Sequence, residues 1–131
     1  MSFNWREFLV IAHQLRLDAG EGIQRTCLGR IYYYVYNTGL SKALSSGLAI
    51  QAGRGRHRQL WDWFRGHPDP AFKQMGLLGN RIYSRRIDAD YKAAPMPNLA
   101  LEVIGQFSRA RQFEELIAGI DGQPPPPALM P

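Results

Sequence analysis

The chain has 131 residues, of which 45% are hydrophobic, a length and composition typical of one folded domain. Its formal net charge of +5 favours an anionic partner, with RNA or DNA ahead of a membrane. The single cysteine, Cys27, excludes an intrachain disulfide, so we expect a reducing, cytoplasmic location. The sequence has no signal-peptide pattern, no lipidation motif and no apolar run of about 20 residues, and we expect no membrane association.

Two helices are predicted in the first third of the chain. Asn4 and Glu7 have the spacing of a capping box, and Gly20 has the place of a left-handed C-cap, so the first helix lies between them. A longer helix follows at about residues 21–44. Because its tyrosines nearly encircle it, we expect one side to pack inside the domain and another against a second chain. These tyrosines are Tyr32, Tyr33, Tyr34 and Tyr36.

A basic loop follows at about residues 45–58, where glycine replaces the apolar pattern. It ends in alternating cationic residues, and a short third helix is predicted from His57 to about Phe64. The loop is either a solvated connector or a surface that steers phosphate groups. Its candidate nucleic-acid-binding residues are Arg54, Arg56, His57 and Arg58.

The central helix is predicted over residues 69–92, with Asp69 as its cap and Pro70 at its first position. Its apolar stripe continues onto Arg86, so a charge stands where the pattern requires a core residue. Asp90, four residues further on, is a suitable partner, and so is an acidic group from another chain. Two interpretations stay open: a structural ion pair at a helix end, or a phosphate or ribose site on a basic helix face. The stripe comprises Phe72, Met75, Leu78 and Ile82.

The last helix is predicted to begin at Asn98, its cap, and to carry a wide apolar face as far as Ile120. Pro124 to Pro127 then force an extended polyproline geometry, and we expect a mobile tail. No segment alternates with a period of two. The predicted fold is therefore all-α: a five-helix, up-down bundle over residues 1–120, with a short third helix, followed by a flexible proline-rich tail at 121–131.

Most catalytic chemistries lack their motifs here. The three histidines and one cysteine have no metal-ligand spacing, and the chain contains neither a phosphate-binding P-loop nor a nucleophile elbow. We therefore expect neither a metal nor a cofactor. Beside the loop residues, one constellation on the central helix remains: Arg85, Arg86, Asp88, Asp90 and Tyr91.

Three motifs, in this order, resemble the HEPN domain family of small all-α proteins. Residues 24–34 are similar to its arginine followed by paired aromatics, and Gly55-Arg-His57 before Leu60-Trp61 is similar to its glycine-histidine start of the third helix. Arg86-Ile-Asp-Ala-Asp-Tyr91 resembles its motif of an arginine, four variable residues and a histidine, which one branch ends in Ala-Asp-Tyr. The resemblance covers about residues 3–120.

The resemblance implies a homodimer whose central helices meet and place both arginine motifs in one basic cleft. Many members of the family cleave RNA there without metal. Some are toxins paired with a nucleotidyltransferase-like antitoxin, and others act in defence or RNA processing. By this resemblance, Arg86 would hold the scissile phosphate, and the residue at position 91, here Tyr91, would be the acid or base. Arg85 would bind nucleic acid. Asp88 and Asp90 would be supporting residues of the site.

The chain departs from the family pattern at two positions. Ile87 replaces a polar residue, usually asparagine, and Tyr91 replaces the histidine. An unperturbed tyrosine titrates near pH 10 and is therefore a poor base at neutral pH. Residues 86 and 91 also lie about 140° apart on an ideal helix, so they do not share one helix face. Two hypotheses follow. The protein is a metal-independent ribonuclease, or it is a catalytically inactive HEPN module that binds nucleic acid or nucleotide, or scaffolds a larger complex.

Overall fold

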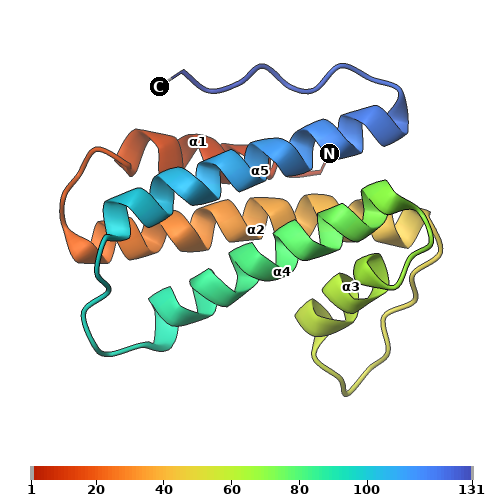
Figure 1. The fold of residues 1–131 in the computed structure, drawn as a ribbon, viewed down its shortest axis with the longest axis horizontal. Helices are drawn as coiled ribbons and strands as arrows, with labels where there is room; N and C mark the ends of the chain where they lie inside the picture. Colours follow the sequence, from red (N-terminus) through yellow and green to blue (C-terminus); the bar gives the residue numbers. More distant parts are fainter. Residues whose placement is uncertain (1, 131) are drawn as a thin grey trace.

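The computed structural model describes residues 2–130, which form five α-helices and no strand (Figure 1). The predicted all-α, five-helix architecture is confirmed. Successive helices run antiparallel in the pairs α1–α2 and α4–α5, and the short α3 lies against α4. The helices are α1 (Arg6–Leu15), α2 (Glu21–Ser45), α3 (Arg56–Arg65), α4 (Pro70–Tyr91) and α5 (Leu99–Asp121).

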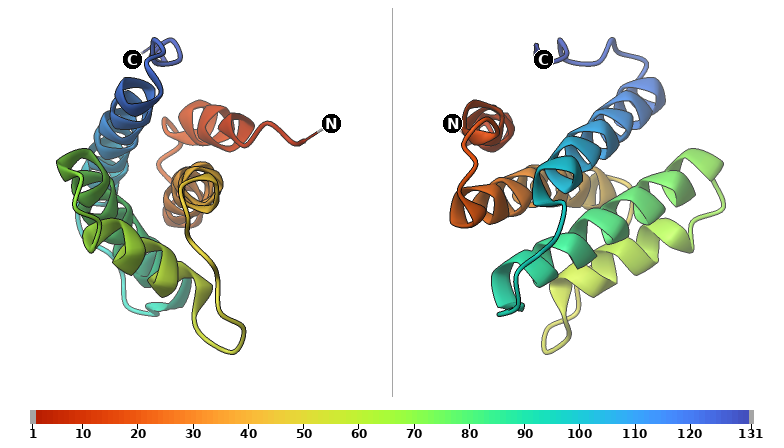
Figure 2. Two further views of the ribbon diagram at one scale, coloured as in Figure 1. Left: turned by 90° about the vertical axis from the view of Figure 1, so that its right-hand side faces the viewer. Right: turned by 60° about the vertical axis from the view of Figure 1, so that its left-hand side comes forward.

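The centre of the bundle is α2, which packs against each of the other four helices. Seen nearly end-on, it has α1 on one side and a curved layer of α3, α4 and α5 on the other (Figure 2, left). The loop between α2 and α3 extends away from this layer. The side chains that close the core between α2, α3 and α5 are large and aromatic, among them Tyr32, Trp61, Phe64 and Phe113, all fully buried.

Two glycines of α4 allow α3 to approach it closely. A Cβ atom on Gly79 would lie 2.1 Å from the ring of Trp61, and one on Gly76 would lie 2.7 Å from the backbone nitrogen of Arg65. Real Cβ atoms do not approach other groups so closely, so a side chain at either position would push α3 away. This close packing holds the second half of α3 against α4, while His57 at its start contacts the middle of α2, where the candidate site lies.

The helix ends agree with the sequence at some positions and differ at others. Asp69 caps α4 as predicted, since its Oδ1 accepts a hydrogen bond of 2.8 Å from the Ala71 nitrogen. Asn4 accepts from the Arg6 nitrogen at 3.1 Å, and α1 begins only at Arg6. The prediction for Gly20 was wrong: its φ is −65°, and it precedes α2 as the N-cap because α1 already ends at Leu15.

Asn98 is the residue before α5, but its side chain does not cap the helix as predicted. Its backbone is left-handed, with φ 55° and ψ 34°, and no side-chain capping hydrogen bond forms. Asparagine is among the few residues that adopt this conformation readily. Its role is thus to turn the chain from the 92–97 connection into α5.

The tyrosines of α2 are covered within a single chain. Tyr32, Tyr34 and Tyr36 are buried, and Tyr33 is half-buried. The expected surplus of aromatic faces is therefore absent here, because α3 and α4 cover one side of α2 while α5 covers another. The homodimer itself stays a prediction, and it needs support from another surface.

The proline-rich tail follows a defined path back along α5 towards α1 (Figure 1). Arg6 Nη2 donates to the carbonyl oxygen of Pro127 at 2.8 Å, and Arg111 Nη1 donates to that of Pro126. Leu129 packs against the core. Proline carbonyls have no helical or sheet partner, so arginine side chains provide the missing donors. The mobility expected for this tail and the domain boundary at residue 120 stay predictions.

Candidate functional site

Arg86 lies on the second-last turn of α4, on the face turned toward α2. Its side chain is only 12% exposed, and its Nη2 donates a hydrogen bond of 2.7 Å to the hydroxyl of Tyr33. The guanidinium carbon also stands 5.0 Å from the centre of the Tyr33 ring, which adds a cation–π attraction. The apolar stripe therefore placed Arg86 correctly at the edge of the core.

Asp90 is the acidic partner of Arg86, as the spacing of four residues predicted. Its Oδ2 lies 2.8 Å from Arg86 Nε. The Nε–H bond does not point at this oxygen, however, so the contact is an ion pair without an aligned hydrogen bond, and the buried Nε has no acceptor. The Asp90 carboxylate is 39% exposed and keeps part of its hydration. Arg86 is thus held in place without having all its donors satisfied.

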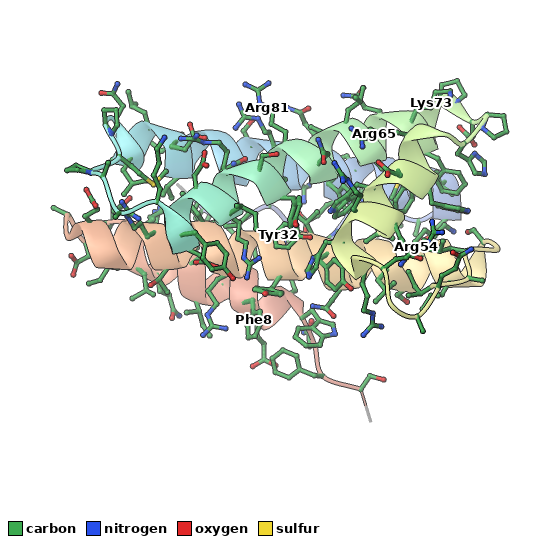
Figure 3. The ribbon with its side chains drawn as sticks, turned by 90° about the horizontal axis from the view of Figure 1, so that it is seen from below. Phe8, Tyr32, Arg54, Arg65, Lys73 and Arg81 are labelled. Carbon is green, nitrogen blue, oxygen red and sulfur yellow. The ribbon has the colours of Figure 1, made fainter. Side chains whose placement is uncertain are left out.

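His57 is not part of a solvated loop, because α3 begins at Arg56 and its first turn packs into an aromatic cluster. The ring of His57 stacks on Tyr83, with centroids 5.4 Å apart, and lies 4.2 Å from the ring of Tyr36. The Nδ1 atom of His57 is hydrogen-bonded to the hydroxyl of Tyr32. The Tyr32 side chain lies between α2 and α4 (Figure 3). The cluster consists of Tyr32, Tyr33, Tyr36, His57 and Tyr83, and we call it the tyrosine cluster.

The hydrogen bonds of this cluster favour neutral His57. The indole nitrogen of Trp61 donates to the oxygen of Tyr32 at 3.2 Å, which leaves the tyrosine proton for His57 Nδ1. Burial lowers the pKa of His57 below its usual 6.5, and the positive charges of Arg86 and Arg56 lower it further. Burial also raises the pKa of Tyr32, so the pair stays uncharged.

Arg86 and His57 are brought together by shared tyrosines. Tyr33 contacts the Arg86 guanidinium and has its ring centre 6.3 Å from that of His57, and Tyr32 contacts both as well. The residues come from α2, α3 and α4 and are far apart in the sequence. The sequence identified Arg86 and His57 separately but missed Tyr33 as the link, although the paired tyrosines of α2 were the available signal.

The remaining predicted residues of α4 lie apart from this cluster. Arg85 binds two carboxylates: its Nη1 donates to Asp88 Oδ2 at 2.7 Å, and its Nε pairs with Glu102 of α5. Tyr91 is the last residue of α4 and is 74% exposed. Arg85 therefore connects α4 to α5, while Tyr91 is largely exposed.

The arginines of the basic loop are exposed around the start of α3. Arg54, Arg56 and Arg58 are all exposed, and Figure 3 shows Arg54 on the loop that leads into α3. The loop is closed by Gln59, which exchanges two hydrogen bonds with the backbone of Gln51, at 2.8 and 3.0 Å. The charge of Arg56 reaches the tyrosine cluster, where it partly offsets the rise that burial causes in the Tyr36 pKa.

Neither a metal site nor a membrane span is found in the described residues. Between residues 2 and 130, no group of three or more metal-ligating side chains comes together, and no helix combines the length and apolarity needed to cross a bilayer. No family model, curated protein or solved structure matches the chain.

Proposed function

We propose that the protein binds RNA at Arg86 and the half-buried members of the tyrosine cluster, as a HEPN-like homodimer in which two such sites share one cleft. These members are Tyr33, His57 and Tyr83. The observation that carries this proposal is the position of Arg86, a nearly buried cation on Tyr33 beside the half-buried His57. Arginine combined with aromatic rings is the usual means of holding the phosphates and bases of single-stranded nucleic acid. The exposed arginines at the start of α3 add positive charge beside it.

In the ribonuclease form of this proposal, Arg86 holds the scissile phosphate and stabilises the charge of the transition state without a metal. Tyr91 is then the acid or base, with its exposed hydroxyl available to RNA or to the partner subunit. A histidine titrates closer to neutral pH than a tyrosine, so Tyr91→His should raise the rate of cleavage. A toxin of this kind would pair with a nucleotidyltransferase-like antitoxin.

A catalytically inactive HEPN-like module is the second candidate, and the existing contacts of Arg86 favour it. The guanidinium already has Tyr33 and Asp90 as partners, and Arg85 is held by Asp88 and Glu102. In this form the protein binds nucleic acid or nucleotide, or joins a larger complex through another protein subunit, and Arg86 mainly shapes the binding surface.

Incubation of the purified protein with labelled single-stranded RNA, with and without EDTA, separates these forms. Cleavage that persists in EDTA identifies a metal-independent ribonuclease, and binding without cleavage identifies the inactive module. Absence of both contradicts the proposal.

The salt dependence of RNA binding tests the basic loop. Binding should weaken steeply with salt, and changing Arg54, Arg56 and Arg58 to Ala should flatten that dependence because fewer counterions are released. An unchanged slope would make the loop a connector only.

The shared cleft requires a dimer, which sedimentation at micromolar concentration tests directly. A dimer would have twice the chain mass of 14.9 kDa. A clean monomer in the presence and absence of RNA would remove the shared cleft from the proposal and leave each Arg86 site to act alone.

A further inference from the structure

A groove of about 510 Å³ runs between α4 and α5, and nothing in the proposed RNA site uses it. We propose that it binds the phosphate group of a nucleotide. The groups that carry this proposal are Arg81 of α4 and Arg109 of α5, which both line the groove. Figure 3 shows Arg81 at the outer edge of α4, on the side away from α1 and Phe8.

The two arginines share the groove without a carboxylate between them. Among residues 2–130, neither Arg81 nor Arg109 forms an ion pair. Glu102 is close enough to act on the charge of Arg109, but its carboxylate already binds Arg85. Arg109 instead donates to a neutral acceptor, Gln106 Oε1, at 3.1 Å. Two cations facing one cavity repel each other, and an anion between them removes that repulsion.

The titration of Arg109 agrees with this charge imbalance. Burial lowers its pKa, and the charge of Arg81 lowers it further, while Glu102 offsets only part of the effect. A guanidinium stays protonated in proteins even so, and the site therefore keeps two positive charges. Arginine pairs bind phosphate strongly because each planar guanidinium can donate two parallel hydrogen bonds to it.

The rest of the groove suits a nucleotide better than a bare anion. Gln74, Ser108 and Gln112 provide further hydrogen-bonding groups, and Leu77 provides an apolar surface that is 56% exposed. A phosphate between the arginines would leave the base or sugar free to cover Leu77. The volume also falls within the range of about 300–1,000 Å³ that small-molecule sites occupy.

Gly105 is the residue that permits this arrangement of Arg109. A Cβ atom at position 105 would lie 3.2 Å from Arg109 Nη1, one turn further along α5. This is tighter than an ordinary contact, so a methyl group at position 105 would make the guanidinium shift by a few tenths of an ångström. Gly105→Ala shifts the guanidinium slightly and leaves the charge of the protein unchanged, which makes it a test of position.

The groove is separate from the proposed RNA site. Arg81 and Arg86 are five residues apart on α4, which places them about 140° apart around the helix axis. Arg86 faces α2, whereas Arg81 faces the groove beside α5. Failure of RNA cleavage or binding at Arg86 would thus leave this proposal unaffected. The phosphate could belong to a free nucleotide or to the backbone of RNA, and both sources share the same chemistry.

Isothermal titration of the full chain with three probes tests the site: AMP, uncharged adenosine, and a short RNA without terminal phosphates. We expect AMP to bind and adenosine not to bind. Arg109→Gln should weaken AMP at least about tenfold, since a charged hydrogen bond of this kind contributes about 1.5–3 kcal/mol. Lys73→Gln is the matched control, because it removes one exposed charge from α4 outside the groove.

Gly105→Ala should weaken AMP several-fold and raise the melting temperature, because alanine stabilises a helix interior relative to glycine. A lower affinity for AMP together with a higher melting temperature excludes misfolding as the cause of the weaker binding. Binding of the RNA probe alone, with the same loss in Arg109→Gln, would also support the site and assign it to the RNA backbone. The proposal is overturned if neither phosphate probe binds, or if Arg109→Gln and Lys73→Gln weaken binding equally.

Discussion

Glu114 and Arg86 are both charged side chains in the interior, but their partners differ in number and geometry. The side chain of Glu114 is 2% exposed and accepts from Arg6 at 2.7 Å, Tyr34 at 2.6 Å and Arg111 at 3.2 Å. Arg86 has one aligned hydrogen bond, to Tyr33, and an ion pair with the partly exposed Asp90.

The difference separates a structural charge from one that can bind a ligand. Glu114 joins α1, α2 and α5 and, through Arg6 and Arg111, also the tail. The buried Glu114 carboxylate accepts four hydrogen bonds from Arg6, Tyr34 and Arg111, which fills its lone-pair sites and makes it a structural charge. Arg86 can exchange Asp90 for a phosphate at lower cost, because the displaced carboxylate returns to water.

The largest expected effect is the loss of the Glu114 carboxylate. Glu114→Ala leaves Arg6 and Arg111 without their anion and Tyr34 without its acceptor, which should lower the free energy of unfolding by about 3–5 kcal/mol. Urea unfolding followed by circular dichroism measures it. Glu115→Ala is the control, since Glu115 is exposed and its loss should cost less than about 0.5 kcal/mol. Equal effects would show that Glu114 is not a structural charge.

Arg86→Ala is the counterpart at the candidate site, and its effect should fall mainly on activity. The free energy of unfolding should drop by about 1–2 kcal/mol, because Asp90 can hydrate once its partner is gone. If the protein cleaves RNA, the rate should fall by two to three decades, or about 3–4 kcal/mol of transition-state stabilisation. Folding and cleavage are measured on the same sample. A folded mutant that cleaves as fast as the parent would end the assignment of Arg86 as a catalytic residue.

The contrast between the two charges also shows what the sequence could reveal. The apolar stripe of α4 predicted both the burial of Arg86 and its partner Asp90, because both depend on helical spacing within one element. Helical spacing gave no indication of the contacts that Glu114 makes. Its partner Arg6 is 108 residues away, and the two meet only because α1 and α5 both pack against α2.

The tyrosine cluster marks a second limit of local patterns. His57 was predicted to start a helix after a basic loop, which is nearly correct, since α3 begins one residue earlier. Its aromatic neighbours come from α2 and α4, and the close α3–α4 packing depends on Gly76 and Gly79, which no periodicity identifies. The fold class was thus predictable from the sequence, while the grouping of Arg86 with His57 required the structure.

Tyr33→Phe tests the one aligned hydrogen bond of Arg86 and keeps the aromatic ring. The variant should lose about 1 kcal/mol of unfolding free energy, because only the hydroxyl is removed and the site is partly exposed. Tyr91→Phe, which removes an exposed hydroxyl from the same region, is the control and should leave stability unchanged. Equal stability of both variants would mean that Tyr33 does not hold Arg86 in solution.

The smallest effect concerns the pH dependence that His57 introduces. Burial and the charges of Arg86 and Arg56 lower its folded-state pKa below the ordinary 6.5. As pH falls below about 6.5, the unfolded chain therefore takes up this proton before the folded one does, and the folded state loses stability. Above that pH both states carry neutral His57 and its contribution is constant.

His57→Gln removes the pH-dependent contribution of His57, so the difference in unfolding free energy between parent and variant should shrink from pH 7 toward pH 5. His13→Gln, on α1 beside Phe107 and away from the tyrosine cluster, should leave that pH dependence in place. If the difference in unfolding free energy between the parent and His57→Gln stays constant over this range, His57 is accessible to protons in the folded state. The tyrosine cluster would then be more open than its packing indicates.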